Sequence, residues 1–298
     1  MNNSIVIRIL LAVIISLGLA FHGFKKKSLD ISGCIAAILV GFVSFATSYR
    51  YGLILILFYY TSSKLTKVKE DVKERLESNY MQGGQRNYIQ VFANSILATI
   101  ISLIYIYYVG EDKHMSFNNH MLGSYLSSMY VGHYACAAAD TWASELGILS
   151  KANPRLVTTL FLRTVPHGTN GGMSILGTVA SAMGGAFIGF VYWICSYFLD
   201  TSDSPQYPMI IVGLLCGVLG SLIDSILGAT LQASYYSKDR KCIVKTQQEI
   251  SSDLSVELVC GIDFLSNEAV NLVSILLTMI ISFFISPKVY CFFDSKQC

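Results

Sequence analysis

The chain alternates long apolar runs with short polar segments, a pattern typical of a protein that crosses a membrane several times. A spanning helix needs roughly 20 mostly apolar residues. The third window below is short unless its helix continues into the charged segment after it. The eight windows cover about residues 4–22, 29–47, 50–62, 88–109, 120–141, 173–199, 207–230 and 268–286. The pattern predicts an all-α, polytopic membrane bundle of about eight transmembrane helices, forming one integral-membrane domain over residues 1–298.

Composition supports a membrane protein and argues against a nucleic-acid partner. Of the 298 residues, 53% are hydrophobic and 13% are charged, whereas a soluble domain carries about 25% charged residues. The net charge is +2, and no long basic block provides the electrostatic footprint of a nucleic-acid-binding protein. The eight cysteines are scattered, so those inside apolar segments are expected to be small buried residues. Cys291 and Cys298 would be able to pair if they face an oxidising lumen.

The first window has two interpretations. Gly18 and Ala20 form a passable signal-peptide cleavage pattern. Lys25–Lys27 directly after the apolar run favour instead a retained helix with that end in the cytosol, because Lys and Arg near helix ends set orientation.

Carrying this orientation through eight spans places most of the 21 Lys and Arg residues in cytosolic segments. The exceptions are Arg8, Arg50, Lys113, Lys288 and Lys296. Both termini are therefore expected on the non-cytosolic side, in a membrane that we expect to be an endomembrane.

Two polar segments are expected at the cytosolic face. Within residues 63–87, Ser63–Glu77 has apolar residues at three- and four-residue spacing, which predicts an amphipathic helix with its lysines on the wet face. A solvated helical linker is an equal alternative, because the apolar stripe is narrow. The loop over residues 233–262 shows little apolar periodicity and is expected to be flexible.

Small residues recur every four positions in the sixth and seventh windows. Such spacing lets helix backbones approach closely in lipid. We therefore interpret these residues as packing positions, through which the chain would also be able to form a homo-oligomer. They are Gly177, Ser181, Gly185 and Gly189, then Gly213, Gly217, Ser221, Ser225 and Ala229.

The residues with the clearest chemistry lie between Ala139 and Gly172. Asp140 ends an apolar helix, and a carboxylate is expensive in hydrocarbon, so it indicates a functional site at the membrane edge. Polar residues surround it, and a glycine-rich loop follows, in which successive N–H groups are able to converge on a phosphate. The candidates in this stretch are Thr141, Ser144, Glu145, Arg163, His167, Gly168, Thr169, Asn170, Gly171 and Gly172.

A second acidic helix end follows the same plan. Asp224 and Ser225 mirror Asp140 and Thr141, which suggests a parallel repeat of helix pairs. Further candidates are Asp263, Asn267 and Asn271 at the start of the last helix. Helix capping and interhelical hydrogen bonding are the alternative explanations for this last group.

These side chains suggest a magnesium site. On one helix Asp140 and Glu145 point apart, so a metal would be shared between Asp140 and Asp224 or Asp263. Mg²⁺ takes oxygen ligands, commonly one or two carboxylates with phosphates and waters. Phosphoryl transfer needs mainly positioning and charge neutralisation, which Mg²⁺, Arg163 and a glycine-rich loop would supply. His167 lacks a second histidine at ligand spacing, so zinc is not expected.

The same residues resemble the transmembrane protein 19 family, polytopic membrane proteins that include the plant phytyl-phosphate kinase of chloroplasts. The resemblance covers most of the chain from about residue 30, with departures at His167 and Ser266. It is carried by Ala139-Asp140-Thr141-Trp142-Ala143-Ser144-Glu145-Leu146-Gly147, Arg163, Val165-Pro166-His167-Gly168-Thr169-Asn170-Gly171-Gly172, Gly220-Ser221, Asp224-Ser225, Gly228-Ala229-Thr230-Leu231-Gln232, Asn267 and Val270-Asn271.

This resemblance implies a kinase, using CTP or another nucleoside triphosphate, that converts a membrane-embedded isoprenyl monophosphate to the diphosphate. The lipid tail would lie between the glycine-packed helices and its phosphate at Gly168–Gly172, with Arg163 neutralising the transferred group. Two other functions remain open from the residues: a transporter of a small anion or ion through Asp140 and Asp224, and a non-catalytic membrane scaffold.

Overall fold

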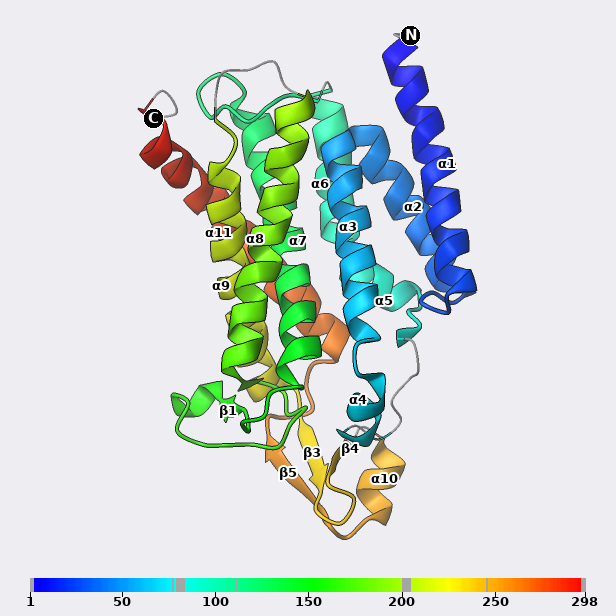
Figure 1. The fold of residues 1–298 in the computed structure, drawn as a ribbon, viewed down its shortest axis with the longest axis vertical. Coiled ribbons are helices and arrows are strands. Elements are labelled where there is room, and N and C mark those ends of the chain that lie inside the picture. Colours follow the sequence, from blue (N-terminus) through cyan, green and yellow to red (C-terminus); the bar gives the residue numbers. More distant parts are fainter. Residues whose placement is uncertain are drawn as a thin grey trace.

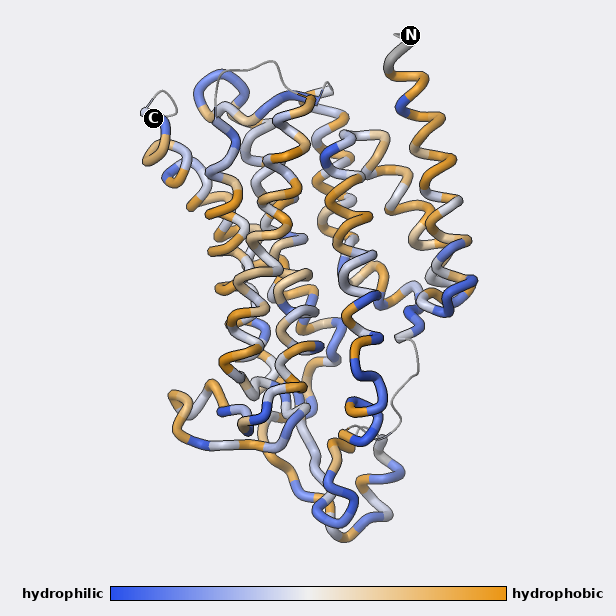
Figure 2. The backbone as a smooth tube through the Cα atoms, viewed as in Figure 1, coloured by the Kyte–Doolittle hydropathy of each residue, from blue (hydrophilic) through white to orange (hydrophobic). Residues whose placement is uncertain are grey.

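The computed structural model describes residues 3–76, 78, 84–110, 112–199, 205–244 and 246–295. Its long helices form an elongated bundle with a small sheet at one end, and both chain ends lie at the other end (Figure 1). Apolar residues dominate the middle of the bundle, and polar residues gather toward its two ends (Figure 2). The long helices are α1 (Asn3–Lys25), α2 (Ile31–Thr47), α3 (Tyr49–Thr66), α6 (Ile96–Tyr108), α7 (Met121–Gly147), α8 (Ile175–Leu199), α9 (Pro208–Leu231) and α11 (Asn267–Phe293).

Every apolar window contains helix, which confirms the all-α membrane class. Among the described helices, α1, α8, α9 and α11 are long and apolar enough to cross a membrane by themselves. α2 and α6 are apolar but shorter, whereas α3 continues to Thr66 and so removes the shortness expected of the third window. The total of eight spans stays a prediction.

The fourth window is broken into two helices instead of forming one. α5 (Tyr88–Ala93) ends at Ala93 with Asn94 as its C-cap, and α6 begins at Ile96. A break in an apolar setting releases backbone groups that need new partners. The imidazole Nε2 of the fully buried His133 in α7 donates to the Asn94 carbonyl oxygen at 2.9 Å. This contact explains how the interruption is tolerated, and why a histidine lies within α7.

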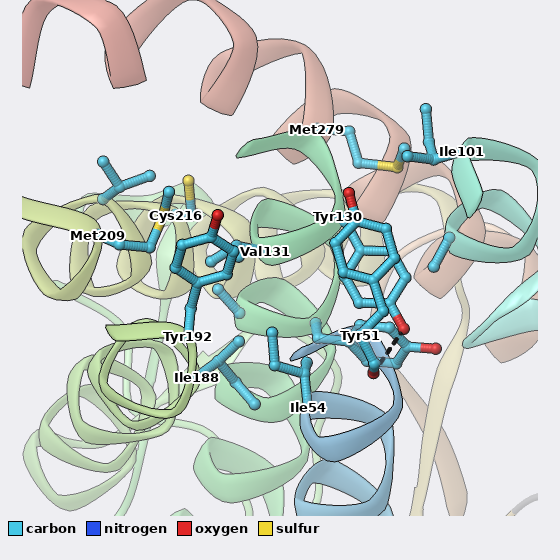
Figure 3. Packing of buried hydrophobic residues seen from close by; sticks show 14 of the residues in the cluster. Tyr51, Ile54, Ile101, Tyr130, Val131, Ile188, Tyr192, Met209, Cys216 and Met279 are labelled. Carbon is cyan, nitrogen blue, oxygen red and sulfur yellow. Dashed lines mark hydrogen bonds between the residues drawn. The ribbon is translucent and has the colours of Figure 1, made fainter. Parts of the chain in front are cut away.

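The core between α3, α7, α8 and α9 combines aromatic rings with small residues (Figure 3). The rings of Tyr51 and Tyr130 stack with centroids 3.8 Å apart. The Tyr51 hydroxyl hydrogen-bonds the Ser127 hydroxyl, and the Tyr130 hydroxyl donates to the Tyr51 carbonyl oxygen, both at 2.9 Å. Tyr51 and Tyr130 therefore satisfy their hydroxyl groups inside the bundle. Cys136, Cys195 and Cys216 are buried as expected.

Glycines allow α8 and α9 to pack with their backbones in contact. A Cβ added at Gly185 would collide with the Gly213 carbonyl oxygen and lie 2.7 Å from the Gly217 Cα. Gly189 meets the Met209 carbonyl oxygen in the same way. The packing interpretation of these residues is therefore met within one chain, and these glycine faces are already covered by their own neighbours.

The polar loop over residues 233–262 contains regular structure, which corrects the expectation of a flexible segment. Strand β3 (Ser234–Ser237) pairs antiparallel with β4 (Cys242–Val244) on one side and β5 (Val256–Cys260) on the other. The short helix α10 (Gln247–Ser252) connects β4 to β5. The strands are too short to give a clear periodic signal in the sequence, which is why the prediction of a flexible loop was wrong.

A charge network orders the end of this sheet. Arg240 pairs with Glu249 at 2.8 Å and with Asp253 at 3.2 Å. The Thr246 hydroxyl and the Arg240 guanidinium lower the pKa of Glu249 to about 2. Hydrogen bonds from Ser255 and Ser237 lower the pKa of Asp253 to about 2.

The segment over residues 63–87 is partly helical, and its expected orientation is wrong at one lysine. α3 runs to Thr66, and α4 (Glu70–Leu76) follows after a turn. Lys73 points into the protein instead of into water, with its side chain 3% exposed. Residues 77 and 79–83 lie outside the described residues, as do Lys296 and Cys298, one member of the expected Cys291–Cys298 pair.

We expect Gly185→Val to destabilise the bundle by about 3 kcal/mol or more, because the new side chain would force two backbones apart. The matched control is Gly18→Val in α1, where an added Cβ meets nothing within 4 Å. Thermal unfolding of the purified protein in detergent measures both variants. Equal melting temperatures for the two would contradict the close contact of α8 and α9.

Candidate active site at the sheet end of the bundle

The candidate residues gather where α7, α8 and α9 reach the sheet end of the bundle (Figure 1). They surround a cavity of about 530 Å³, here called the loop cavity. Its walls come from the sheet-end turns of α7 and α9, the first turns of α8 and α11, the glycine-rich loop and the sheet. Among its lining residues are Asp140, Ser144, His167, Gly168, Thr169, Asn170, Gly171, Gly172, Asp224, Ser225, Asp263 and Asn267.

The carboxyl groups of Asp140 on α7 and Asp224 on α9 face each other within hydrogen-bonding reach. Ser274 on α11 donates its hydroxyl to Asp224 Oδ2 at 3.0 Å. One turn deeper, Gly220 allows the helices to approach, because a Cβ there would lie 2.6 Å from the Cys136 Sγ. The close approach of α9 to α7 therefore brings the two carboxyl groups together.

Two adjacent carboxylates in a half-buried setting repel each other unless a cation or a proton lies between them. The pair consequently fits a divalent cation with oxygen ligands, and magnesium commonly takes one or two carboxylates in protein sites. Asp263 lines the same cavity but is exposed at its edge. In the described part of the chain, no three His, Cys, Asp or Glu side chains come together at metal-binding distances. Substrate oxygens would have to complete such a site.

The glycine-rich loop is held by the strand pair β1 (Arg155–Leu156) and β2 (Gly172–Met173). Several of its N–H groups already bond within the protein. Thr169 N–H donates to the Pro166 carbonyl oxygen, Asn170 N–H to Ser234 Oγ, and Gly172 N–H to the Thr169 carbonyl oxygen. The loop therefore does not present five N–H groups to one anion. The N–H groups of Gly168 and Gly171 are the remaining candidates for binding an anion.

Backbone conformation and close packing explain why glycines occupy positions 168 and 171 of the loop. Gly168 and Gly171 have φ of +83° and +71°, a region that other residues rarely adopt. At Gly171 a side chain would also collide with Ala229 and would lie 2.5 Å from the Ser225 carbonyl oxygen. The loop is thus pressed onto α9 one turn beyond Asp224.

His167 contributes a nitrogen to the loop cavity. It lines the cavity, and its Nδ1 is buried with no hydrogen-bond partner within the described residues. A buried polar atom without a partner is uncommon in native proteins. The imidazole is therefore suited to donate to, or accept from, a ligand in the loop cavity.

A second cavity, of about 250 Å³, lies on the other side of α7 and is here called the helix crevice. Asp140, Ser144 and Asn267 line both cavities, so they form a shared wall. The remaining lining is amphipathic. It includes the predicted site residues Thr141, Glu145 and Asn271, Arg86, and the apolar side chains of Leu19, Ala37, Val40, Leu55, Ile56, Phe58 and Val91.

Glu145 forms an ion pair instead of standing free. Lys73 Nζ lies 2.6 Å from Glu145 Oε2, and the side chains are 3% and 20% exposed. The same ammonium donates to the carbonyl oxygens of Leu65 and Thr66 at 2.9 and 3.0 Å. The pair therefore fixes the end of α3 and the start of α4 against α7.

Two expectations about placement are not met. Arg163 is exposed on the loop and lines neither cavity. The backbone contact between α8 and α9 leaves no room there for a lipid tail.

At the start of α11, Ser266 caps the helix by accepting from Ala269 N–H, as the capping alternative proposed. Asn267 still lines both cavities.

Sequence reasoning missed Ser274 and Lys73. Ser274 follows Asn271 by one turn of α11, so a scan for polar residues on one face would have found it. Lys73 carries no such signal, because its partner lies far away in the sequence.

Residues 14–279 match the family model described as integral membrane protein DUF92. The chain belongs to this family. Its family membership agrees with the resemblance inferred from the motifs, whereas the narrower transmembrane protein 19 assignment stays a prediction. No solved structure matches the chain.

Relatives of this DUF92 chain occur in plants and archaea. Protein PGR of Arabidopsis thaliana is 41% identical over 295 residues, which cover 97% of this chain and 100% of that protein. An uncharacterized membrane protein of Methanocaldococcus jannaschii, MJ0933, is 28% identical over 76% of this chain and 84% of its own length. Protein VTE6, chloroplastic, of Arabidopsis thaliana is 28% identical over 68% of this chain and 56% of its own length.

We expect Lys73→Met to cost about 3 kcal/mol of unfolding free energy, because it leaves Glu145 without its cation in a mostly buried position. The double variant Lys73→Met, Glu145→Gln should recover most of this loss. Thermal unfolding in detergent measures both. The control is Lys238→Met, which breaks the exposed 2.6 Å pair with Glu257, a change worth about 1 kcal/mol or less. Similar losses for the two single variants would contradict a buried role for Lys73.

Proposed function

We propose that this protein is a phosphotransferase that converts an isoprenyl monophosphate in the membrane to the diphosphate, at the expense of CTP or another nucleoside triphosphate. The observation that carries the proposal is the pair of cavities that share the wall of Asp140, Ser144 and Asn267. One cavity is polar and acidic with a glycine-rich loop, and the other is lined by apolar side chains of membrane helices. Such a pair suits a water-soluble donor and a lipid acceptor that meet at one wall.

In the proposed reaction, an oxygen of the lipid monophosphate attacks the γ-phosphorus of the nucleotide. The bond from the γ-phosphorus to the bridging oxygen breaks, and the nucleoside diphosphate leaves. A phosphate oxygen is already ionised, so the acceptor needs no general base. Asp140 and Asp224 would hold Mg²⁺, which neutralises phosphate charge when bound. Gly168, Gly171 and His167 would orient the donor phosphates through their N–H groups.

Family membership and the motif resemblance support the proposal. The motif resemblance described above implies isoprenyl-phosphate kinase chemistry, and similarity to a chloroplastic plant protein extends over two thirds of the chain. We accordingly propose an organelle or other internal membrane as the location, with the sheet end of the bundle in the cytosol or its equivalent.

The helix contacts support ion transport less well than they support the proposed phosphotransferase. The buried hydroxyls between α7 and α11 bond with one another: Ser282 donates to the Ser128 carbonyl oxygen at 2.6 Å, and Ser128 donates to Ser286 Oγ at 2.6 Å. Such contacts are the usual polar bonds between membrane helices. Uptake of an anion into proteoliposomes without nucleotide would favour transport over the proposed kinase.

We expect Asp140→Asn to lower turnover at least 100-fold, a typical effect of removing one group that stabilises transferred charge. Folding should be unharmed, because the change removes repulsion between Asp140 and Asp224. The assay supplies purified protein with MgCl₂, CTP or ATP, and a panel of isoprenyl monophosphates. Lipid diphosphate is measured together with the melting temperature.

The control for this assay is Asp239→Asn, which makes the same chemical change at an exposed position in the sheet hairpin. It should keep full turnover. Undiminished turnover in Asp140→Asn, or no nucleotide-dependent product with any of the lipids, would overturn the proposed function.

A further inference from the structure

In the part of the chain that the structure describes, three carboxylates line each cavity, including Asp140, Glu145 and Glu268 in the helix crevice, and the two cavities differ in whether a cation is also present. Three aspartates line the loop cavity, and no Lys or Arg is found among its described lining residues. In the helix crevice, the described lining includes one such cation, Arg86. An acidic cavity attracts a metal–nucleotide complex, whereas a phosphate monoester without its own metal needs a cation. The crevice, not the glycine-rich loop, therefore has a cation that is able to bind a lipid phosphate.

Arg86 is held in place by its backbone and its side chain. Its N–H donates to the Ser28 carbonyl oxygen, and its carbonyl oxygen accepts from Asp30 N–H, both at 3.0 Å. Its Nη1 donates to Ser63 Oγ at 3.2 Å. Burial lowers the pKa of the guanidinium from its ordinary value, yet an arginine stays protonated at neutral pH. The positive charge is thus fixed where the turn between α1 and α2 meets α3.

The charge of Arg86 is not consumed by its acidic neighbour. Glu145 is close enough to interact with Arg86 electrostatically. Lys73, however, lies 2.6 Å from the Glu145 carboxylate and balances it. Glu268, at the start of α11, is the other glutamate that lines the crevice. Arg86 and the Asn271 amide therefore offer a cation and a hydrogen-bond donor to an anion inside the crevice, next to the wall that contains Asp140.

An apolar path leads from Arg86 into the membrane. Leu55 and Phe58 line the crevice on α3. Leu55 precedes Ser63, the residue that Arg86 contacts, by about 12 Å of helix at 1.5 Å per residue. Ala37 and Val40 of α2 face the same space. At about 250 Å³, the crevice is smaller than the usual range of about 300–1,000 Å³ for small-molecule sites. It suits the first units of one hydrocarbon chain, not two.

We propose that the helix crevice binds the acceptor as a single-chain isoprenyl monophosphate, with the phosphate on Arg86 and the tail along Ala37, Val40 and Leu55. This inference rests on the proposed function for the identity of the lipid. It moves the acceptor phosphate from Gly168–Gly172 to Arg86, and it moves the tail from the α8–α9 contact to the space between α2, α3 and α7. The two phosphates then approach the Asp140 wall from opposite sides.

The test measures equilibrium binding of farnesyl monophosphate to the protein in nanodiscs, without nucleotide. Arg86→Gln should weaken binding about 10-fold or more, as expected for the loss of a charged hydrogen bond. Arg86→Lys should restore part of the loss. Farnesol, which has the same tail and no charge, should bind Arg86→Gln as it binds the unmodified protein. Ala37→Phe, which fills the apolar end, should weaken both ligands.

Arg155→Gln is the matched control, because Arg155 is exposed and lines neither cavity. Its binding of farnesyl monophosphate should be unchanged. Binding of magnesium–CTP to Arg86→Gln should also be unchanged, which shows that the loop cavity has kept its fold. A loss of farnesyl monophosphate binding in Arg163→Gln and not in Arg86→Gln would overturn the proposal.

The outcomes separate this proposal from the proposed function. Normal lipid binding by Arg86→Gln, in a protein that turns over nucleotide and lipid, would refute the crevice site and leave the kinase intact. Arg86-dependent lipid binding without any nucleotide-dependent transfer would support the crevice and refute the kinase.

Discussion

The approach of α9 to α7 at Gly220 is the constraint on which the candidate site depends. No side chain larger than hydrogen fits there, because the Cys136 Sγ and the Thr278 Oγ1 would lie within 2.8 Å of a Cβ. Asp140 and Asp224 each follow this contact by one helical turn. Packing that is favourable for the apolar part of the bundle therefore brings together two carboxyl groups that repel each other. The repulsion between these carboxyl groups costs free energy, and a bound cation would offset that cost.

The rest of the sheet end keeps this arrangement rigid. Gly171 presses the glycine-rich loop onto α9, and Asn170 N–H bonds to Ser234 Oγ of the sheet at 2.9 Å. On the other side, Lys73 ties α4 and the end of α3 to Glu145. Each contact joins segments that are far apart in the sequence. The two cavities thus have walls that are fixed independently, and they meet at the shared wall of Asp140, Ser144 and Asn267.

A feature of the structure was predictable from the sequence where the local sequence of its own helix determines it. The helical class, the placement of both termini opposite the basic segments, and the gathering of Asp140, Asp224 and the glycine-rich loop all follow from apolar windows and charge bias. Properties that depend on a distant partner did not follow. Lys73 looked like a surface lysine because its partner is Glu145, and the break at Asn94 was hidden because His133 satisfies it from another helix.

The misplaced arginine shows the same limit. Arg163 follows the conspicuous motif and was an obvious cation by proximity in sequence, yet it is exposed outside both cavities. Arg86 precedes a membrane helix, where a positive charge already has an explanation in topology. Only the three-dimensional placement of the turn between α1 and α2 brings it beside Glu145 and Asn271. A basic residue at a membrane edge can therefore anchor a helix and face a ligand site at once, and charge bias alone does not separate the two roles.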